Sequence, residues 1–369
     1  MFYYLIFFLS EVPIVISEFF RKNRNRCLQV FFAILGITIL AIVCGIRDYS
    51  IGTDTLEYNS YFYYIDLSKD LLSYCKSLKK IFDIEYTYSF FSYILGRIWL
   101  NAHFCYFMFQ FLIGSNIYLA LNKLRNKISI SLGWLTYCFM FYVLSFNGLR
   151  QCIALSFILL GVSFGLNGKK LSSIISLILA SLFHNASIVA IIIYLIILII
   201  KKSRRSQIKY VYLFASLFAI MFPYIVRYTS LISMLSDKYS NYIVDGSNIS
   251  LVSSLLIRLP MILLMLVDIL MNHRVIGNNE YAIYLIVFME LIMIPVQNIS
   301  TAAGRVLLFW GINKIIAYPL VLKHMYMGSL IKKVVFVSLY IAFLAFVFYF
   351  QIIINNNNQV YPFIISNDF

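Results

Sequence analysis

The stretch that decides the fold class is residues 27–46, CLQVFFAILGITILAIVCGI, followed at once by residues 47–55, RDYSIGTDT. The first part is a nearly uninterrupted apolar run of the length that a helix needs to cross a bilayer. The second part gathers an arginine, two aspartates, two threonines and a glycine at one end of that predicted membrane helix. Because similar apolar runs recur along the chain, the sequence predicts an all-α, polytopic integral membrane helical bundle.

The composition of the whole chain supports this class. Of the 369 residues, 62% are hydrophobic and 12% are charged, and the mean hydropathy is +0.86, whereas a soluble domain has about 25% charged residues. The net charge of +15 would suggest nucleic acid in a soluble protein, but here the basic residues cluster between apolar runs, as in cytoplasmic loops. We therefore predict no nucleic-acid partner. The six cysteines lack paired or metal-ligand spacing, so neither a disulfide nor a metal site is predicted.

Basic blocks orient the predicted spans. The block at residues 21–26 marks the cytoplasmic side, so the N-terminus lies outside and residues 27–46 cross outward. Applied along the chain, this rule predicts about twelve spans in a single transmembrane domain of residues 1–369, with both termini outside. The spans are residues 2–20, 27–46, 103–121, 128–146, 152–166, two within 171–200, 208–227, 251–271, 281–297, 303–321 and 334–353.

Three segments depart from simple membrane crossing. Residues 47–102 are expected to form an extracytoplasmic loop, in which residues 85–100 form an amphipathic helix at the outer interface. The apolar run 171–200 has basic residues on both flanks, so it must cross twice as a re-entrant-like hairpin, with residues 184–187 at its outer turn. A second outer loop is predicted at residues 228–250.

This topology places the unusual polar residues at one outer face. Ionisable residues at membrane depth are costly and mark functional sites by default, and the planar fork of arginine suits a phosphate group. A shared rim of arginines therefore predicts a site for a diphosphate or carboxylate ligand, although any single one could be a snorkelling or salt-bridged side chain. The residues placed at this face are Arg47, Asp48, Asp54, Asn147, Arg150, Gln151, His184, Asn185 and Arg305.

Several of these side chains could take part in proton transfer. His184 could be neutral at pH 7 and accept a proton, or it could only hydrogen-bond the broken backbone of the turn. Asp48 and Asp54 could act as bases, orient an arginine or cap a structured turn; Tyr58 and Glu85 are further candidates of this kind. Because no nucleotide-binding or hydrolase motif is present, an enzyme of this kind needs a donor that is already activated on the outer face, such as a lipid diphosphate.

Four motifs now point to a family. They are GIR at residues 45–47, GTD at 52–54 with Tyr58, NGLRQCIA at 147–154 and FHNAS at 183–187. With Arg305 before an aromatic span and the closing YPF at 361–363, they resemble the EpsG/Wzy-type family of polysaccharide polymerases over nearly the whole chain. The resemblance implies a metal-independent enzyme without a cofactor, multi-pass in the bacterial inner membrane, with an all-helical fold of the GT-C class and an active site facing the periplasm.

The same resemblance implies a reaction and its partners. An O-antigen or related polysaccharide polymerase transfers the growing glycan from undecaprenyl diphosphate to the non-reducing end of the next lipid-linked repeat unit. Its partners would be undecaprenyl-diphosphate-linked oligosaccharide repeat units, membrane lipids, a chain-length regulator and a flippase. We assign catalysis to His184 (the first choice for the base), Asp54 (the second) and Arg47; the predicted substrate-binding residues are Arg150, Arg305, Asp48, Asn147, Gln151, Asn185, Thr53 and Tyr58.

Two other classes compete with this interpretation. A flippase or transporter of lipid-linked oligosaccharide would also need arginines for a diphosphate, but it would place charge near the bilayer midplane and often shows inverted repeats. An O-antigen ligase-like transferase or an acyltransferase would, like a polymerase, act at the outer face. Polar residues gather mainly at one rim of this chain and no repeat is seen, so the polymerase is favoured.

Overall fold

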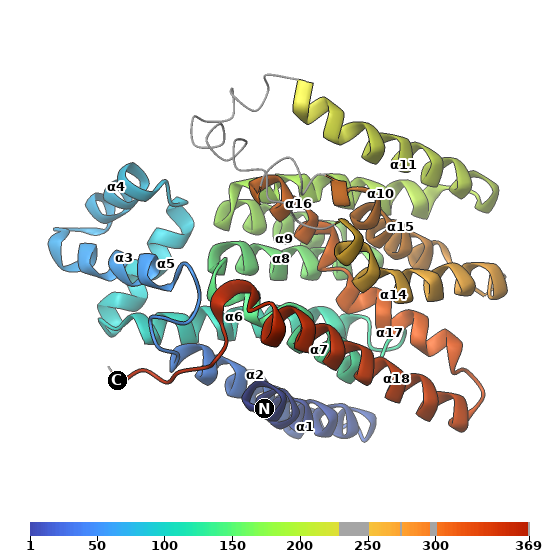
Figure 1. Ribbon diagram of the computed structural model, residues 1–369, viewed down its shortest axis with the longest axis horizontal. Coiled ribbons are helices and arrows are strands. Elements are labelled where there is room, and N and C mark those ends of the chain that lie inside the picture. The colour runs from blue at the N-terminus through green and yellow to red at the C-terminus, as the bar shows by residue number, and fades with distance from the viewer. Residues whose placement is uncertain (229–250, 274, 296–300, 368–369) are drawn as a thin grey trace. The chain divides into compact units, whose positions relative to one another are not determined.

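The protein is helical throughout its described part (Figure 1). The computed structural model describes residues 1–228, 251–273, 275–295 and 301–367. Within these ranges no strand occurs, and one isolated bridge pairs Arg47 with Ile365. The predicted all-α class is therefore confirmed for these ranges, whereas most of the predicted outer loop at 228–250 lies outside them.

Eight of the described helical segments are long and apolar enough to cross a membrane, which indicates a multi-pass membrane protein. Two further apolar helices, Ile130–Met140 and Lys170–Phe183, are shorter. The predicted total of about twelve spans stays a prediction. The eight segments are Phe2–Lys22, Arg26–Gly45, Ala102–Lys123, Leu149–Leu166, Asn185–Lys202, Ser254–Met271, Arg305–Met325 and Leu330–Ile354.

The chain divides into two compact units, which are described separately. The first unit consists of Met1–Ile188 and Val337–Phe369, and the second of Val189–Phe336. The predicted single domain is not tested by this division. The first unit contains α1 (Phe2–Lys22), α2 (Arg26–Gly45), α3 (Thr55–Leu67), α4 (Leu71–Phe82), α5 (Tyr86–Ile98), α6 (Ala102–Lys123), α7 (Ile130–Met140), η1 (Tyr142–Phe146), α8 (Leu149–Leu166), α9 (Lys170–Phe183), most of η2 (Asn185–Val189), most of α18 (Leu330–Phe348), η4 (Tyr349–Ile354) and η5 (Asn357–Gln359).

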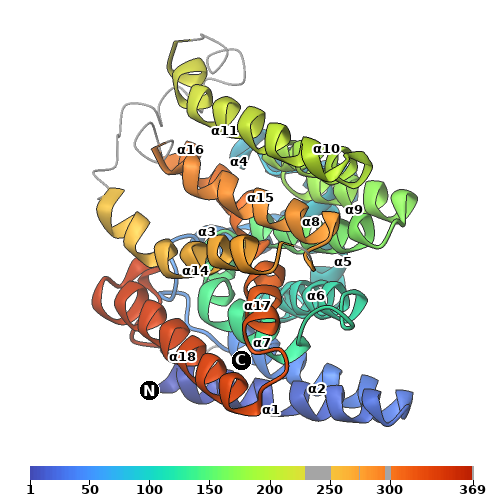
Figure 2. The ribbon, with the colours of Figure 1, turned by 90° about the vertical axis from the view of Figure 1, so that its right-hand side faces the viewer.

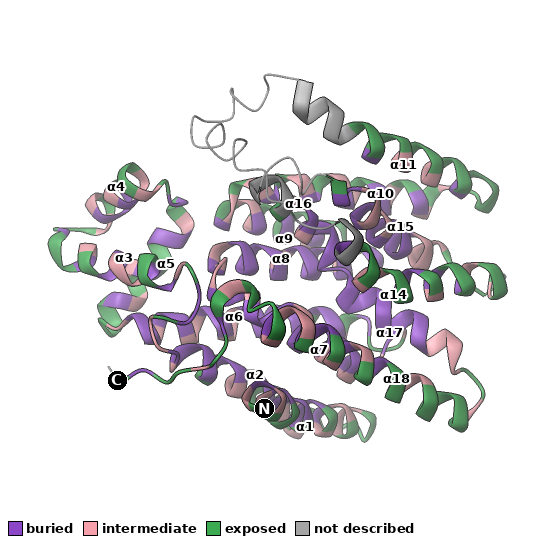
Figure 3. Ribbon diagram, viewed as in Figure 1, coloured by how far each residue is buried: buried purple, intermediate pink, exposed green. Residues whose placement is uncertain are grey.

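Within the first unit, α1, α2, α6, α8 and α9 pack against one another in that order. The helix α8 lies between α6 and α9 in this row and is buried along most of its length (Figure 3). Close approach is possible because small residues lie at the contacts; a Cβ at Gly36 of α2 would be 2.9 Å from the carbonyl oxygen of Ser10 in α1. The first turn of α8 carries Arg150, so this packing fixes the position from which that side chain extends.

The predicted loop of residues 47–102 folds largely into the three short helices α3, α4 and α5. The helix α4 begins with a capping box, in which the Asp70 side chain accepts from the backbone N–H of Ser73 at 2.7 Å. It ends at Asp83, whose φ of 52° is left-handed. The helix α5 lies inside the predicted interfacial helix of residues 85–100. These helices pack through aromatic rings, including Tyr61 against Tyr88.

The second unit contains α10 (Ala190–Lys202), α11 (Arg205–Tyr228), α14 (Leu251–Met271), α15 (Asn278–Ile292), α16 (Thr301–Gly311) and α17 (Lys314–Met325). α15 packs against both α10 and α11 (Figure 2). The buried Glu290 of α15 accepts from Arg258 Nε at 2.8 Å and from Lys314 Nζ at 2.6 Å. This ion cluster joins three helices, and the predicted span of residues 303–321 is divided there into α16 and α17.

The C-terminal residues 355–367, here called the C-terminal strap, return to the start of the polar loop. The N–H of Asp48 donates to the carbonyl of Ile364 at 2.9 Å, and the N–H of Ser366 donates to Ile46 at 2.9 Å. Asn356 and Asn358 of the strap have φ values of 44° and 71°. Asparagine is enriched in this left-handed region, so the backbone conformation at these two positions favours asparagine.

Candidate functional site

Arg47 lies beneath the surface at the end of α2. Its side chain is 0% exposed, and the Nη1 group donates to the carbonyl of Cys44 at 2.7 Å. The guanidinium carbon lies 4.2 Å from the ring centroid of Tyr106 and 4.7 Å from that of Phe146. Contact with two aromatic faces stabilises a desolvated cation. Arg47 therefore anchors the beginning of the loop, and its predicted place on a diphosphate stays a prediction.

The residues after Arg47 form a turn that is held by its own side chains. Asp48 Oδ1 accepts from the hydroxyl of Ser50 at 2.6 Å and from its N–H at 2.9 Å, and these two bonds lower the pKa of the Asp48 carboxyl. Thr53 is exposed, and its hydroxyl donates to Asp54 Oδ1 at 2.8 Å. The φ of Gly52 is 93°, a conformation that favours glycine.

Asn147, predicted to bind substrate, joins this turn to the C-terminal strap. Its Oδ1 accepts from the N–H of Thr53 at 2.8 Å, while its Nδ2 donates to the carbonyl of Asn358 at 3.0 Å. A Cβ at Gly52 would lie 2.6 Å from the same Oδ1, so only glycine permits this approach. Both ends of the Asn147 amide thus bind backbone. Gln151, four residues on, is buried in the first turn of α8.

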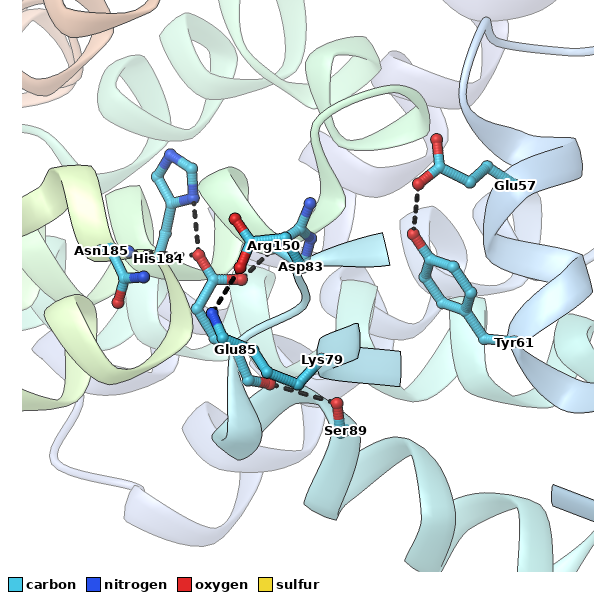
Figure 4. Close-up of polar contacts among 9 residues, drawn as sticks. All are labelled: Glu57, Tyr61, Lys79, Asp83, Glu85, Ser89, Arg150, His184 and Asn185. Atoms are coloured by element: carbon cyan, nitrogen blue, oxygen red, sulfur yellow. Dashed lines mark hydrogen bonds and ion pairs between the residues drawn. The ribbon is translucent and has the colours of Figure 1, made fainter. Parts of the chain in front are cut away.

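A second set of predicted residues meets at Glu85, a residue for which the sequence offered only a minor role (Figure 4). Arg150 Nη1 donates to Glu85 Oε2. His184 Nδ1 lies 3.3 Å from Glu85 Oε1, and the backbone N–H of Asn185 donates to the same oxygen at 3.2 Å. Glu85, Arg150, His184 and Asn185 are called the Glu85 cluster below.

Local structure explains why these groups converge. Glu85 is the extended residue immediately before α5, and Arg150 lies in the first turn of α8. His184 follows the last residue of α9 with extended backbone, at φ −155° and ψ 112°. Three helix ends therefore meet at one carboxylate, which is 8% exposed. The side chains of Arg150 and His184 are 20% and 19% exposed, so both can be reached from outside.

The Glu85 carboxylate is held in its charged form. Burial alone would raise its pKa, but the hydrogen bond with His184 and the charges of Arg150 and His184 outweigh burial and lower the pKa to about 2. Opposite charges and hydrogen bonds to the charged form have this effect in general. At neutral pH the cluster therefore contains a fixed anion that holds one arginine and orients one imidazole.

Tyr58 lies on the other side of Arg150. Burial raises the pKa of the Tyr58 hydroxyl to about 12, although Arg150, which hydrogen-bonds this hydroxyl, acts in the opposite direction. The charges of Asp54 and Glu57 raise this pKa further. Tyr58 thus stays protonated at neutral pH and connects the loop after Arg47 to the Glu85 cluster.

The structure thus sorts the predicted residues into groups. Arg150, His184 and Asn185 come together at Glu85 with Tyr58 beside them. Arg47, Asp48 and Asn147 instead contact the C-terminal strap. Arg305 is exposed in α16 of the second unit, and its predicted role in substrate binding stays a prediction. In the part of the chain that the structure describes, no three His, Cys, Asp or Glu side chains gather to hold a metal ion.

Comparison with known protein families shows to which family the chain belongs. The EpsG family matches residues 30–365. The chain belongs to the EpsG family. The matched range contains the whole Glu85 cluster and most of the C-terminal strap, and EpsG membership indicates a glycosyltransferase-like polysaccharide polymerase. The resemblance seen in the sequence is therefore confirmed. No curated protein and no solved structure matches the chain.

Proposed function

We propose that this EpsG-family protein polymerises a surface polysaccharide, O-antigen or a related glycan, at the periplasmic face of the bacterial inner membrane. It transfers the growing glycan from undecaprenyl diphosphate to the non-reducing end of the next lipid-linked repeat unit. The Glu85 cluster carries this proposal, because it places a cation and a proton acceptor on two sides of one carboxylate. About twelve spans, a GT-C-like fold, and cooperation with a flippase and a chain-length regulator belong to the same proposal.

The transfer breaks one bond and forms another. The bond from the anomeric carbon of the donor to the diphosphate oxygen breaks, and the electron pair leaves with the diphosphate. The hydroxyl oxygen of the acceptor bonds to that carbon, and its proton must go to a base. The protein therefore has to stabilise developing negative charge and to accept one proton.

Arg150 is suited to the first task. Preorganised cations stabilise a leaving group best when they need not move during the reaction. Glu85 binds Nη1 of Arg150, and Tyr58 binds the same guanidinium, so its plane is fixed before substrate arrives. One fifth of the side chain remains exposed for a phosphate oxygen. The family resemblance adds Arg305 as a second cation on the diphosphate.

His184 is suited to the second task. With its proton on Nδ1, the imidazole donates to Glu85 Oε1, and Nε2 is the nitrogen that would take the proton of the acceptor hydroxyl. The carboxylate then stabilises the imidazolium that forms, as in other carboxylate–histidine pairs. Asp54, whose Oδ1 accepts from the hydroxyl of Thr53, is the alternative base. Asn185 is exposed beside His184, where its amide can bind a sugar hydroxyl.

The proposal is tested by deleting this gene in a host whose polysaccharide is attached to lipid A core, and by examining the surface glycan of the deletion strain. Loss of a polymerase leaves core that bears a single repeat unit, and the wild-type gene should restore the ladder of longer chains. Bare core would contradict the proposal, because loss of a flippase or a ligase gives that result. Complementation with an Arg150→Ala variant should leave the single-repeat form.

A further inference from the structure

Two helices that lead away from the Glu85 cluster carry large exposed apolar side chains on their outer faces. The helix α5 begins at Tyr86, directly after Glu85, and α9 ends at Phe183, directly before His184. The two helices pack against each other. Any apolar surface that they share therefore begins at the proposed diphosphate site.

The outer face of α9 consists of leucine and isoleucine from one end to the other. Ile175, Ile178 and Leu182 are 48%, 52% and 48% exposed. The facing part of α5 adds Phe90 and Phe91, which are 41% and 42% exposed. By contrast, 83% of α8 is buried, so the helix that carries Arg150 offers no such surface.

An aromatic stack joins the two helices beneath this surface. The ring of Phe91 lies 5.7 Å from that of Phe183 at an interplanar angle of 22°. Phe183 in turn lies 5.8 Å from Phe157 of α8 at 17°. Since Phe183 is 2% exposed, it forms a closed floor between α5 and α9 rather than an opening into the core.

We infer that the outer faces of α5 and α9 bind the polyprenyl tail of the lipid-linked substrate whose diphosphate lies at Arg150. This inference rests on the proposed function, because the occupant is the tail of the proposed donor. A tail that leaves the Glu85 cluster must follow an element that is both apolar and exposed, and α9 supplies such a face over about 21 Å at 1.5 Å per residue. Bulk phospholipid lacks a diphosphate and has no reason to prefer this face over others.

Site-specific photo-crosslinking in membrane vesicles tests this surface. A photoreactive phenylalanine analogue replaces Phe90, Ile178 or, as the matched control, Ile42. Ile42 lies near the same end of α2 as the polar loop and is 45% exposed, but it belongs to neither α5 nor α9. The probe is radiolabelled undecaprenyl-diphosphate-linked oligosaccharide, competed with excess unlabelled phosphatidylglycerol.

Labelling at Phe90 and Ile178 should be several-fold stronger than at Ile42 and should survive the phospholipid. Equal labelling at all three positions, or complete loss on competition, overturns the inference, because either result describes ordinary membrane lipid. Crosslinking does not depend on turnover, so it is separate from the deletion strain. If labelling is equal at the three positions but the deletion strain makes core with a single repeat unit, only the tail-binding surface is rejected. If labelling is selective but the deletion strain makes bare core, the tail-binding surface is supported and the polymerase function is rejected.

Discussion

The Glu85 carboxylate pairs with the guanidinium of Arg150, 65 positions further along the chain. This pair joins the start of α5 to the first turn of α8. Removing one partner from a buried ion pair leaves the other uncompensated, which is costly. Variants of these two residues therefore probe stability and activity together, and each needs a measurement of protein amount.

Glu85→Gln keeps the shape of the side chain but removes its charge. Arg150 then loses its counter-ion and His184 loses the anion that stabilises its protonated form, so polymerisation should fall by about 10²-fold or more. The readout is the polysaccharide ladder at matched protein amounts. Asp66→Asn removes an exposed carboxylate of α3 and should leave the ladder unchanged. A normal ladder from Glu85→Gln would show that the cluster is not the active site.

Arg150→Lys keeps the charge and removes the planar fork. A lysine ammonium cannot bind Glu85 and a phosphate in the same fixed geometry, so most activity should be lost. The control is Arg97→Lys on α5, where the arginine is exposed and lies over the ring of Tyr93. If Arg150→Lys produces chains of wild-type length and amount, a charge alone suffices and the assigned geometry is wrong.

His184→Ala should abolish most polymerisation, because it removes the imidazole that lies 3.3 Å from Glu85 and is the proposed base. Asp54→Asn is the informative comparison, since Asp54 is the alternative base. The length distribution of the glycan and the protein amount are measured for both variants. Full activity of His184→Ala together with loss of activity in Asp54→Asn would transfer the role of base to Asp54.

The lowered pKa of Glu85 predicts how stability depends on pH. A carboxyl whose folded pKa is about 2, below its ordinary value of 4.5, stabilises the fold above the ordinary value. That contribution, on the order of 3 kcal/mol, is lost as pH falls towards 2. Thermal unfolding of the purified protein in detergent should show this acid loss in the wild type, and Glu85→Gln should lack this component. Parallel pH curves for the two proteins would refute the assignment.

Asn147→Asp separates the two hydrogen bonds that join the loop to the C-terminal strap. The oxygen that accepts from Thr53 is kept, but the donor to the Asn358 carbonyl is replaced by a repelling oxygen. The expected loss of stability is about 1–3 kcal/mol, seen as a lower melting temperature. Asn122→Asp, in an exposed contact with Arg125, is the control and should melt like the wild type. An unchanged melting temperature for Asn147→Asp would mean that the strap contributes no stability through this contact.

Apolar runs of membrane-spanning length were enough to predict the helical class and the main membrane helices. The predicted span at residues 27–46 corresponds to α2, and that at 103–121 corresponds to α6. The span predicted at 128–146 is instead α7 followed by the 3-10 turn η1, with non-helical backbone at Phe141. Such breaks depend on contacts with other helices, which an apolar run does not reveal.

The sequence predicted which residues belong to the candidate site better than it predicted how they are arranged. His184 and Arg150 were chosen because polar residues are rare at membrane depth, and the structure brings both to Glu85. The sequence could not single out Glu85, because a lone acidic residue before a short helix resembles an ordinary helix cap. Nor could it predict that Arg47 lies between the rings of Tyr106 and Phe146, since those rings come from distant segments.

The C-terminal strap has a practical consequence for mapping topology. Reporter fusions of the usual kind delete everything downstream of the junction, so any junction before Asn358 removes the backbone partners of Asp48, Gly52 and Asn147. Such fusions report on a chain whose polar loop at residues 47–54 has lost its contacts with the strap. Reporters inserted into the otherwise intact chain keep the strap, and the sidedness of the early helices should be read from such insertions.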